Sequence, residues 1–148
     1  MDQSALQGAV QTVIRNLSDF SNADVVINDY SILDGPVSNA PYVIIENVLT
    51  ANITEGMGGV EQGELELPFG IYEPFVDWET TLNNLRNRED AVVNGFNGDD
   101  WSANGMSGVS IQFVRLDNTI EIHDPAAERS ISDPVYVMRP VVLQMELF

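Results

Sequence analysis

Residues 77–96 of this 148-residue chain, DWETTLNNLRNREDAVVNGF, predict the helix around which the other segments pack. Its large apolar side chains follow spacings that keep them on one side of a 3.6-residue spiral. They are Trp78, Leu82, Leu85, Val92 and Phe96, with Val93 beside them. Asp77 is a candidate N-cap, and Gly95, Asn97 and Gly98 tolerate the left-handed backbone that ends many helices. A helix with one apolar stripe requires a flat apolar surface to cover.

The other side of this helix is polar. Asn83, Arg86, Asn87, Asp90 and Asn94 fall mainly there. Arg86 and Arg88 are candidates for binding the carboxylates of a partner. Ion pairs within the helix or between subunits are the plainer explanation for both arginines.

The flanking segments predict a sheet and a second helix. An amphipathic helix is expected over Ser4–Phe20, with Ser4 as its cap. Strands are expected at Asp24–Tyr30, Pro41–Leu49, Gly63–Phe75, Val109–Leu116, Thr119–His123 and Val135–Phe148. The pattern predicts an α+β fold, in which two amphipathic helices cover one face of an antiparallel or mixed β-sheet. Residues 1–148 are expected to form a single domain.

Three details of the strands carry further expectations. The run YVII at 42–45 predicts burial on both faces and therefore a central strand. Pro68 and Pro74 place the Gly63–Phe75 strand at a sheet edge, and Pro140 marks an edge or a bulge, because proline lacks a ladder donor. Residues 117–118, Asp-Asn, are expected to form a hairpin turn.

A glycine-rich segment interrupts the pattern of elements. Gly56, Gly58, Gly59 and Gly63 lie among glutamates. A phosphate cradle is disfavoured, because such loops are usually assisted by a lysine and the chain has none. We expect an extended arm or hairpin that orders against a neighbouring subunit. The chain closes on Leu147 and Phe148, which are expected to be buried in a sheet or against another chain.

The charge of the chain excludes several classes of partner. Twenty-three acids face six bases, all arginine, for a formal net charge of −17. Duplex DNA and anionic membrane surfaces would repel such a protein, so neither is an expected binding partner. The acids form either a solvated face, as in a saline habitat, or the lining of a path that a polyanion slides along without sticking.

The absence of cysteine excludes disulfides, and MDQSALQGAV at residues 1–10 does not resemble a signal peptide.

The sequence carries no catalytic constellation. His123 is the only histidine, and nothing near it resembles a nucleophile elbow. Asp99 and Asp100 lack the ligand spacing of a calcium-binding helical loop. With 23 carboxylates, pairs suited to hydrolysis arise by chance. We therefore expect no enzymatic activity, no cofactor and no metal.

The order of elements resembles the tail terminator (tail completion) proteins of long-tailed bacteriophages. The resemblance covers most of the chain. It comprises the N-terminal amphipathic helix, the strand VVIND, the Gly-Pro turn before PYVIIE, the glycine-rich excursion and the helix in FVDWETTLNNLRNREDAVVNGF. Such proteins typically form a six-membered ring that caps the tail tube and then docks to the head connector. They have no active site.

The resemblance implies a structural protein of the virion tail or neck, present in the host cytoplasm during assembly. Its partners would be further copies of itself in a homohexamer, the tail tube protein and head–tail connector proteins. DNA would pass through an acidic lumen without specific binding, and no membrane is involved. The residues expected at a subunit or lumen interface are Glu61, Glu64, Glu66, Asp99, Asp100, Arg86, Arg88, Leu147 and Phe148.

Three alternatives remain open at this stage. The first is another neck or tail ring protein, such as a head–tail adaptor or a tail tube protein, which would stack into long cylinders. A small acid-based hydrolase would require a pocket with converging acids. A halophilic binding module would be monomeric at low concentration.

Overall fold

The structure is a computed structural model that describes residues 2–33, 40–55, 61–96, 109–116, 121–123 and 136–147. Within these ranges, residues 33, 50–55, 61–62, 109–116, 121–123 and 147 are described as backbone only. The elements are α1 (Gln3–Asn16), η1 (Ser18–Phe20), β1 (Asp24–Ile27), η2 (Ser31–Leu33), β2 (Tyr42–Ile45), β3 (Leu49–Glu55), β4 (Glu61–Pro74), α2 (Trp78–Phe96), β5 (Val109–Leu116), β6 (Glu121–His123) and β7 (Tyr136–Leu147).

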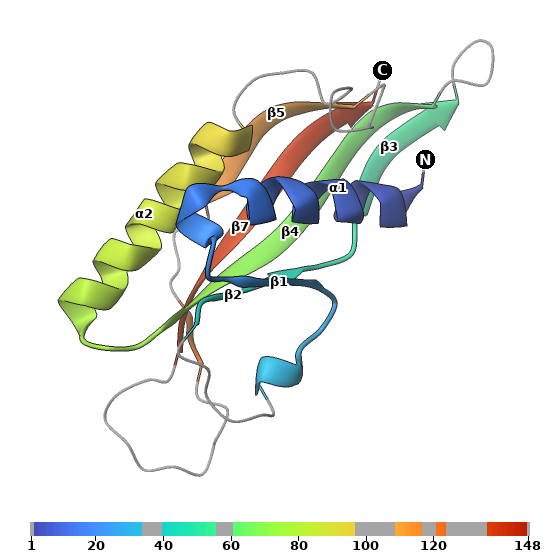
Figure 1. The fold of residues 1–148 in the computed structure, drawn as a ribbon. Coiled ribbons are helices and arrows are strands. Elements are labelled where there is room, and N and C mark those ends of the chain that lie inside the picture. Colours follow the sequence, from blue (N-terminus) through green and yellow to red (C-terminus); the bar gives the residue numbers. More distant parts are fainter. Residues whose placement is uncertain are drawn as a thin grey trace.

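The described strands form one mixed sheet with two helices on one face, so the expected α+β fold is confirmed (Figure 1). The strand order is β1-β2-β4-β7-β5, with β3 also beside β4 and β6 also beside β7. The β1–β2 pair is parallel and the other pairs are antiparallel. Helix α1 packs over β1, and α2 packs over β4 and β5. The two helices therefore cover opposite halves of the same face.

Strand β4 is the centre of the sheet, and the expectation that Pro68 places it at an edge is wrong. On one side β4 pairs with β3 and then β2, and on the other with β7 along Gly63–Pro74. Pro68 is tolerated because of where its nitrogen points. The N–H of Glu46 donates to the carbonyl of Pro68 at 3.0 Å, so the peptide groups of Pro68 face the junction between β2 and β3. The missing donor therefore removes no β4–β7 hydrogen bond.

Pro140 occupies the corresponding place in β7. It pairs with Gly70, two positions along the ladder from the Pro68–Val142 pair, so its nitrogen also points away from β4. On its other side the neighbour of β7 changes from β5, which ends opposite Val141, to β6, which begins opposite Met138. Both prolines thus lie at positions where an interior strand exchanges one neighbour for another.

The predicted hairpin, in which residues 119–123 return along Val109–Leu116, is wrong, and Asp117 and Asn118 themselves lie outside the described residues. Strands β5 and β6 both run antiparallel to β7 and pair with it in succession, from Val109 opposite Leu147 to His123 opposite Tyr136. Strands β5 and β6 therefore run in the same direction and do not form a hairpin with each other. Strand β4 pairs with one side of the long strand β7. On the other side, two short strands placed end to end supply hydrogen-bond partners for the backbone of β7.

Helix α2 buries the predicted stripe only in part. Leu85, Val92 and Phe96 are buried, and Leu82 and Val93 are half-buried. Trp78 is 44% exposed and packs edge-on against Phe75, with ring centroids 5.2 Å apart, so its assignment to the buried stripe is wrong. The five polar residues of the outer side, Asn83, Arg86, Asn87, Asp90 and Asn94, are all exposed, as the sequence predicts. Trp78 is the first residue of α2, which begins at the end of the helical layer far from α1 (Figure 1).

The structure confirms the cap predicted at the start of α2, whereas Gly95 near its end does not have the predicted role. Asp77 is the cap: the N–H of Thr80 donates to Asp77 Oδ1 at 2.8 Å, and this bond lowers the pKa of the Asp77 carboxyl. Gly95 lies inside the helix rather than in a left-handed stop. A Cβ at Gly95 would lie 2.7 Å from a methyl carbon of Leu17, so glycine here permits close contact with the segment after α1.

Helix α1 is shorter than predicted. It spans Gln3–Asn16, and its cap is Asp2, whose Oδ1 accepts from the N–H of Ala5 at 3.2 Å, rather than Ser4. The last predicted turn forms the separate 3-10 helix η1, which buries Phe20. Phe20 thereby reaches the main core, where α1, α2 and the covered face of the sheet meet.

The opposite face of the sheet has a smaller cluster of its own. It consists of Ile32, Tyr42, Ile44, Tyr72 and Tyr136, with Val26 and Met138 packed against it. All four residues of β2 are buried, two in each cluster, which confirms the predicted burial on both faces. Strand β2 is interior, although the central strand is β4. This smaller cluster fills only one end of the open face.

Candidate subunit interface and acidic sheet face

Two of the predicted interface acids lie on the open face of the sheet. In β4, Leu65 and Leu67 point into the main core, so the intervening Glu64 and Glu66 point to the other side. Glu64 is exposed and Glu66 is half-buried. Glu66 Oε1 accepts a hydrogen bond of 2.5 Å from Gln144 Nε2 on β7. This contact orients the Glu66 carboxylate across the two central strands.

A third acid, which the sequence analysis did not predict, lies on the same face of the sheet. Glu146 on β7 is directly opposite Glu64 in the ladder and is exposed. Like charges directly opposite each other destabilise a sheet by a few tenths to about 1 kcal/mol. The signal was present in the alternation of Val141, Leu143 and Met145 with outward positions, which places residue 146 on the same face as Gln144. We call Glu64, Glu66 and Glu146 the acidic face.

The remaining predicted interface residues are placed less fully. Glu61 begins β4 and pairs with Glu55 at the far end of the antiparallel strand β3. Residues 56–60, which hold most of the expected arm, lie outside the described residues. Leu147 ends β7 and pairs with Gly63 and Val109. Asp99, Asp100 and Phe148 lie outside the described residues. Their proposed places at a lumen or interface stay predictions.

Arg86 and Arg88 differ sharply although they are two residues apart. Arg88 Nε donates to Glu73 Oε2 of β4 at 2.5 Å, and Arg88 Nη1 donates to the carbonyl of Asp19. The guanidinium also lies over the ring of Phe20, 5.6 Å from its centroid. Arg86 is exposed and makes no hydrogen bond or ion pair with any described residue. Of the two arginines on α2, only Arg86 therefore has no hydrogen-bond or ion-pair partner among the described residues.

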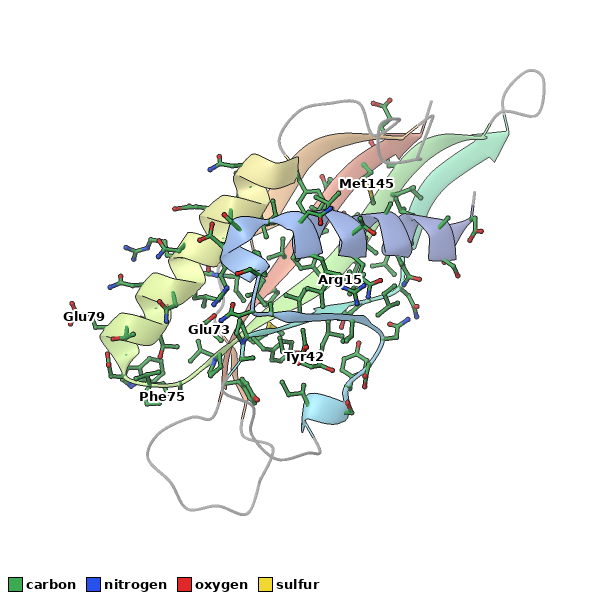
Figure 2. The ribbon with its side chains drawn as sticks, in the orientation of Figure 1. Arg15, Tyr42, Glu73, Phe75, Glu79 and Met145 are labelled. Atoms are coloured by element: carbon green, nitrogen blue, oxygen red, sulfur yellow. The ribbon has the colours of Figure 1, made fainter. Side chains whose placement is uncertain are left out.

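Two buried carboxylates anchor α2 to the sheet. Glu73 is 4% exposed and pairs with Arg88, as above. Glu89 is 7% exposed and accepts a 2.6 Å bond from Arg139 Nε of β7. Figure 2 labels Glu73 beneath the helical layer, between the sheet and α2. Both pairs bridge helix and strand. The Arg88–Glu73 pair is therefore neither the intrahelical pair nor the subunit contact that the sequence suggested for Arg88.

Large apolar side chains are exposed at two places. Among the residues whose side chains are described, they are Tyr30, Leu49, Val76 and Trp78, which are 42%, 56%, 67% and 44% exposed. Tyr30 follows β1 and Leu49 begins β3, both on the β2 side of β4. Val76 and Trp78 lie at the start of α2, beside Phe75 and Glu79, which Figure 2 labels at the outer end of that helix.

The described residues contain no group of three or more His, Cys, Asp or Glu side chains that could hold a metal ion. Every buried side-chain nitrogen or oxygen in this part of the chain has a hydrogen-bond partner. None of the described helices is long and apolar enough to cross a membrane. The interactions that stand out are thus structural bridges and outward-facing charges.

The fold has a counterpart among solved structures. A chain in the virion of a native gene transfer agent (GTA) particle aligns over 97% of this chain and 93% of its own length, with a TM-score of 0.52. This chain shares its fold with a virion protein. The two sequences are 15% identical, so the likeness concerns the fold.

A second solved chain covers 100% of this chain at 14% identity, and its TM-score of 0.47 is too low to carry an argument. No protein-family model matches the sequence. No curated protein matches it either.

Proposed function

We propose that this protein is a structural component of a phage-like virion. The observation that carries the proposal is the likeness in fold to the GTA virion chain, which extends over nearly the whole of both chains. The described contacts agree with a structural role, because the buried charges are used to fasten α2 to the sheet. No residue is assigned a catalytic role.

More finely, we propose a tail terminator: a ring of six copies that caps the tail tube and joins it to the head connector. Closed rings are built from heterologous contacts between different patches of adjacent subunits. The acidic face supplies outward charge on the sheet surface that the helices leave open. Six copies would carry six times −17, or −102 formal charges. A lumen lined by part of that charge would repel the DNA that passes through it.

The native mass of the protein tests the ring. One ring of six copies corresponds to six times 16.3 kDa, or about 98 kDa. We expect this mass either alone or on addition of the tail tube protein, and negative-stain images should show single rings. Long cylinders would instead indicate a tail tube protein, which is the alternative within the same particle. A chain that stays monomeric with and without the tube protein would contradict the proposal.

The acidic lumen is tested by neutralising the acidic face. We expect assembled particles with Glu64→Gln, Glu66→Gln and Glu146→Gln to pass DNA more slowly, with a larger effect at low salt, because the wall would repel the phosphates less. The control changes three exposed acids on the helical side, Asp19→Asn, Glu79→Gln and Asp90→Asn, for the same loss of charge. Unchanged passage in the first variant would count against a lumen at this face.

A further inference from the structure

The exposed apolar side chains form two patches on opposite sides of the molecule. The Trp78 patch consists of Val76, Trp78 and Arg86, at the outer edge of α2. Trp78 and Arg86 are eight residues apart, so they are separated by about 12 Å along the helix axis and by about 80° around it, with half-buried Leu82 midway. Figure 1 shows the start of α2 at one end of the layer, away from α1 and β1.

The Tyr30 patch consists of Tyr30, Glu46 and Leu49, where β1 and β2 end and β3 begins. The Tyr30 hydroxyl donates to Glu46 Oε1 at 3.0 Å. A local hydrogen bond fixes the chain beside Tyr30, because Asp29 Oδ1 accepts from the N–H of Ser31 at 3.0 Å. Asp29 follows Asn28, whose backbone is left-handed. The patch therefore combines two exposed apolar groups with a fixed carboxylate.

The two patches are complementary in charge and alike in apolar character. Arg86 has no partner among the described residues, in a protein with a net charge of −17. The Tyr30 patch holds the carboxylate of Glu46, with that of exposed Asp29 close to it in the chain. The Trp78 patch also has Glu79 near it, and the amide of exposed Asn47 beside Glu46 offers a donor for that acid.

We propose that the Trp78 patch of one copy packs against the Tyr30 patch of the next copy, with Arg86 paired to Glu46. This contact deepens the proposed function, since it rests on the ring proposed above. A twofold contact would join two copies of the Trp78 patch, which as defined holds Arg86 and no carboxylate, whereas contact between the unlike patches pairs Arg86 with Glu46. Because the patches lie on opposite sides of the fold, each copy can contact two neighbours, as a closed ring requires.

Charge reversal and its restoration test this contact. Arg86→Glu and Glu46→Arg are each expected to weaken self-association about tenfold or more, because each places like charges together. The double variant Arg86→Glu/Glu46→Arg is expected to recover most of the wild-type association. Native mass spectrometry or sedimentation of the full chain, with tube protein if the ring requires it, gives the distribution of masses. Asn87→Asp, exposed at the next position, controls for added acidity.

The outcomes separate this contact from the ring itself. Single variants that keep the wild-type mass distribution, or a double variant that stays dissociated while folded by circular dichroism, would overturn the contact and leave the ring standing. Trp78→Ser and Leu49→Ser supply a second measurement without charge: each is expected to weaken association, and full association in both would also overturn the contact. A wild-type chain that never associates would refute the proposed function instead.

Discussion

Replacing Arg88 by alanine is expected to lower the free energy of unfolding by about 3–5 kcal/mol, the usual cost of removing one partner of a buried ion pair. Glu73 would lose its cationic partner while remaining in a site where it is 4% exposed. The same substitution removes the donor to the Asp19 carbonyl and the cation above the Phe20 ring. Arg88 therefore ties together α2, β4 and the segment after α1. Urea denaturation at low protein concentration measures the change.

Arg86→Ala is the matched control for this prediction. The residue is two positions earlier on the same helix, is exposed, and has no partner among the described residues, so a change within about 0.5 kcal/mol is expected. A second variant, Glu73→Gln with Arg88→Met, removes both charges and should recover part of the lost stability. Equal effects of Arg86→Ala and Arg88→Ala would show that Arg88 does not hold the helix to the sheet.

Replacing Phe96 by alanine is expected to cost about 3–5 kcal/mol of unfolding free energy, since it leaves a cavity in the main core. Phe96 is 1% exposed and closes α2 against the central strand, with its ring centroid 6.4 Å from that of Phe69. Trp78→Ala is the contrasting variant, because the sequence places both aromatic residues on one stripe. Since Trp78 is 44% exposed, its loss should cost well under half as much in the monomer.

Denaturation of both variants at concentrations that keep the chain monomeric gives the comparison. A larger loss for Trp78→Ala than for Phe96→Ala would mean that the first turn of α2, and not its last, is packed into the core. Such a result would also remove Trp78 from the exposed patch on which the proposed contact between copies depends.

Much of the fold could be read from local patterns. The 3.6-residue period of the two helices, the cap at Asp77 and the apolar run of β2 depend on neighbours in the chain, and the structure confirms them. Asp2 was missed as the cap of α1 because Ser4, two residues later, is an equally good local candidate.

The sequence contained a signal for the buried ion pairs, namely charged residues at positions that face the core. The gap of seven between Leu85 and Val92 leaves position 89 on the buried side, and it is a glutamate. Likewise Glu73 continues the inward alternation of β4 after Phe69 and Ile71. A charge at an inward position requires a partner. The existence of a partner could have been predicted from the sequence, whereas the identity of that partner depends on which helix and strand pack together.

The sequence by itself determined the helices, most of the strands, the two-layer class and the strongly acidic character of the chain. Only the tertiary structure decided that β4 is central despite Pro68, that β5 and β6 continue along one side of β7, and that Glu146 joins Glu64 and Glu66. The physical reason is range: periodicity and capping act within a few residues, whereas strand neighbours and the direction of a proline nitrogen are set by pairing between distant segments.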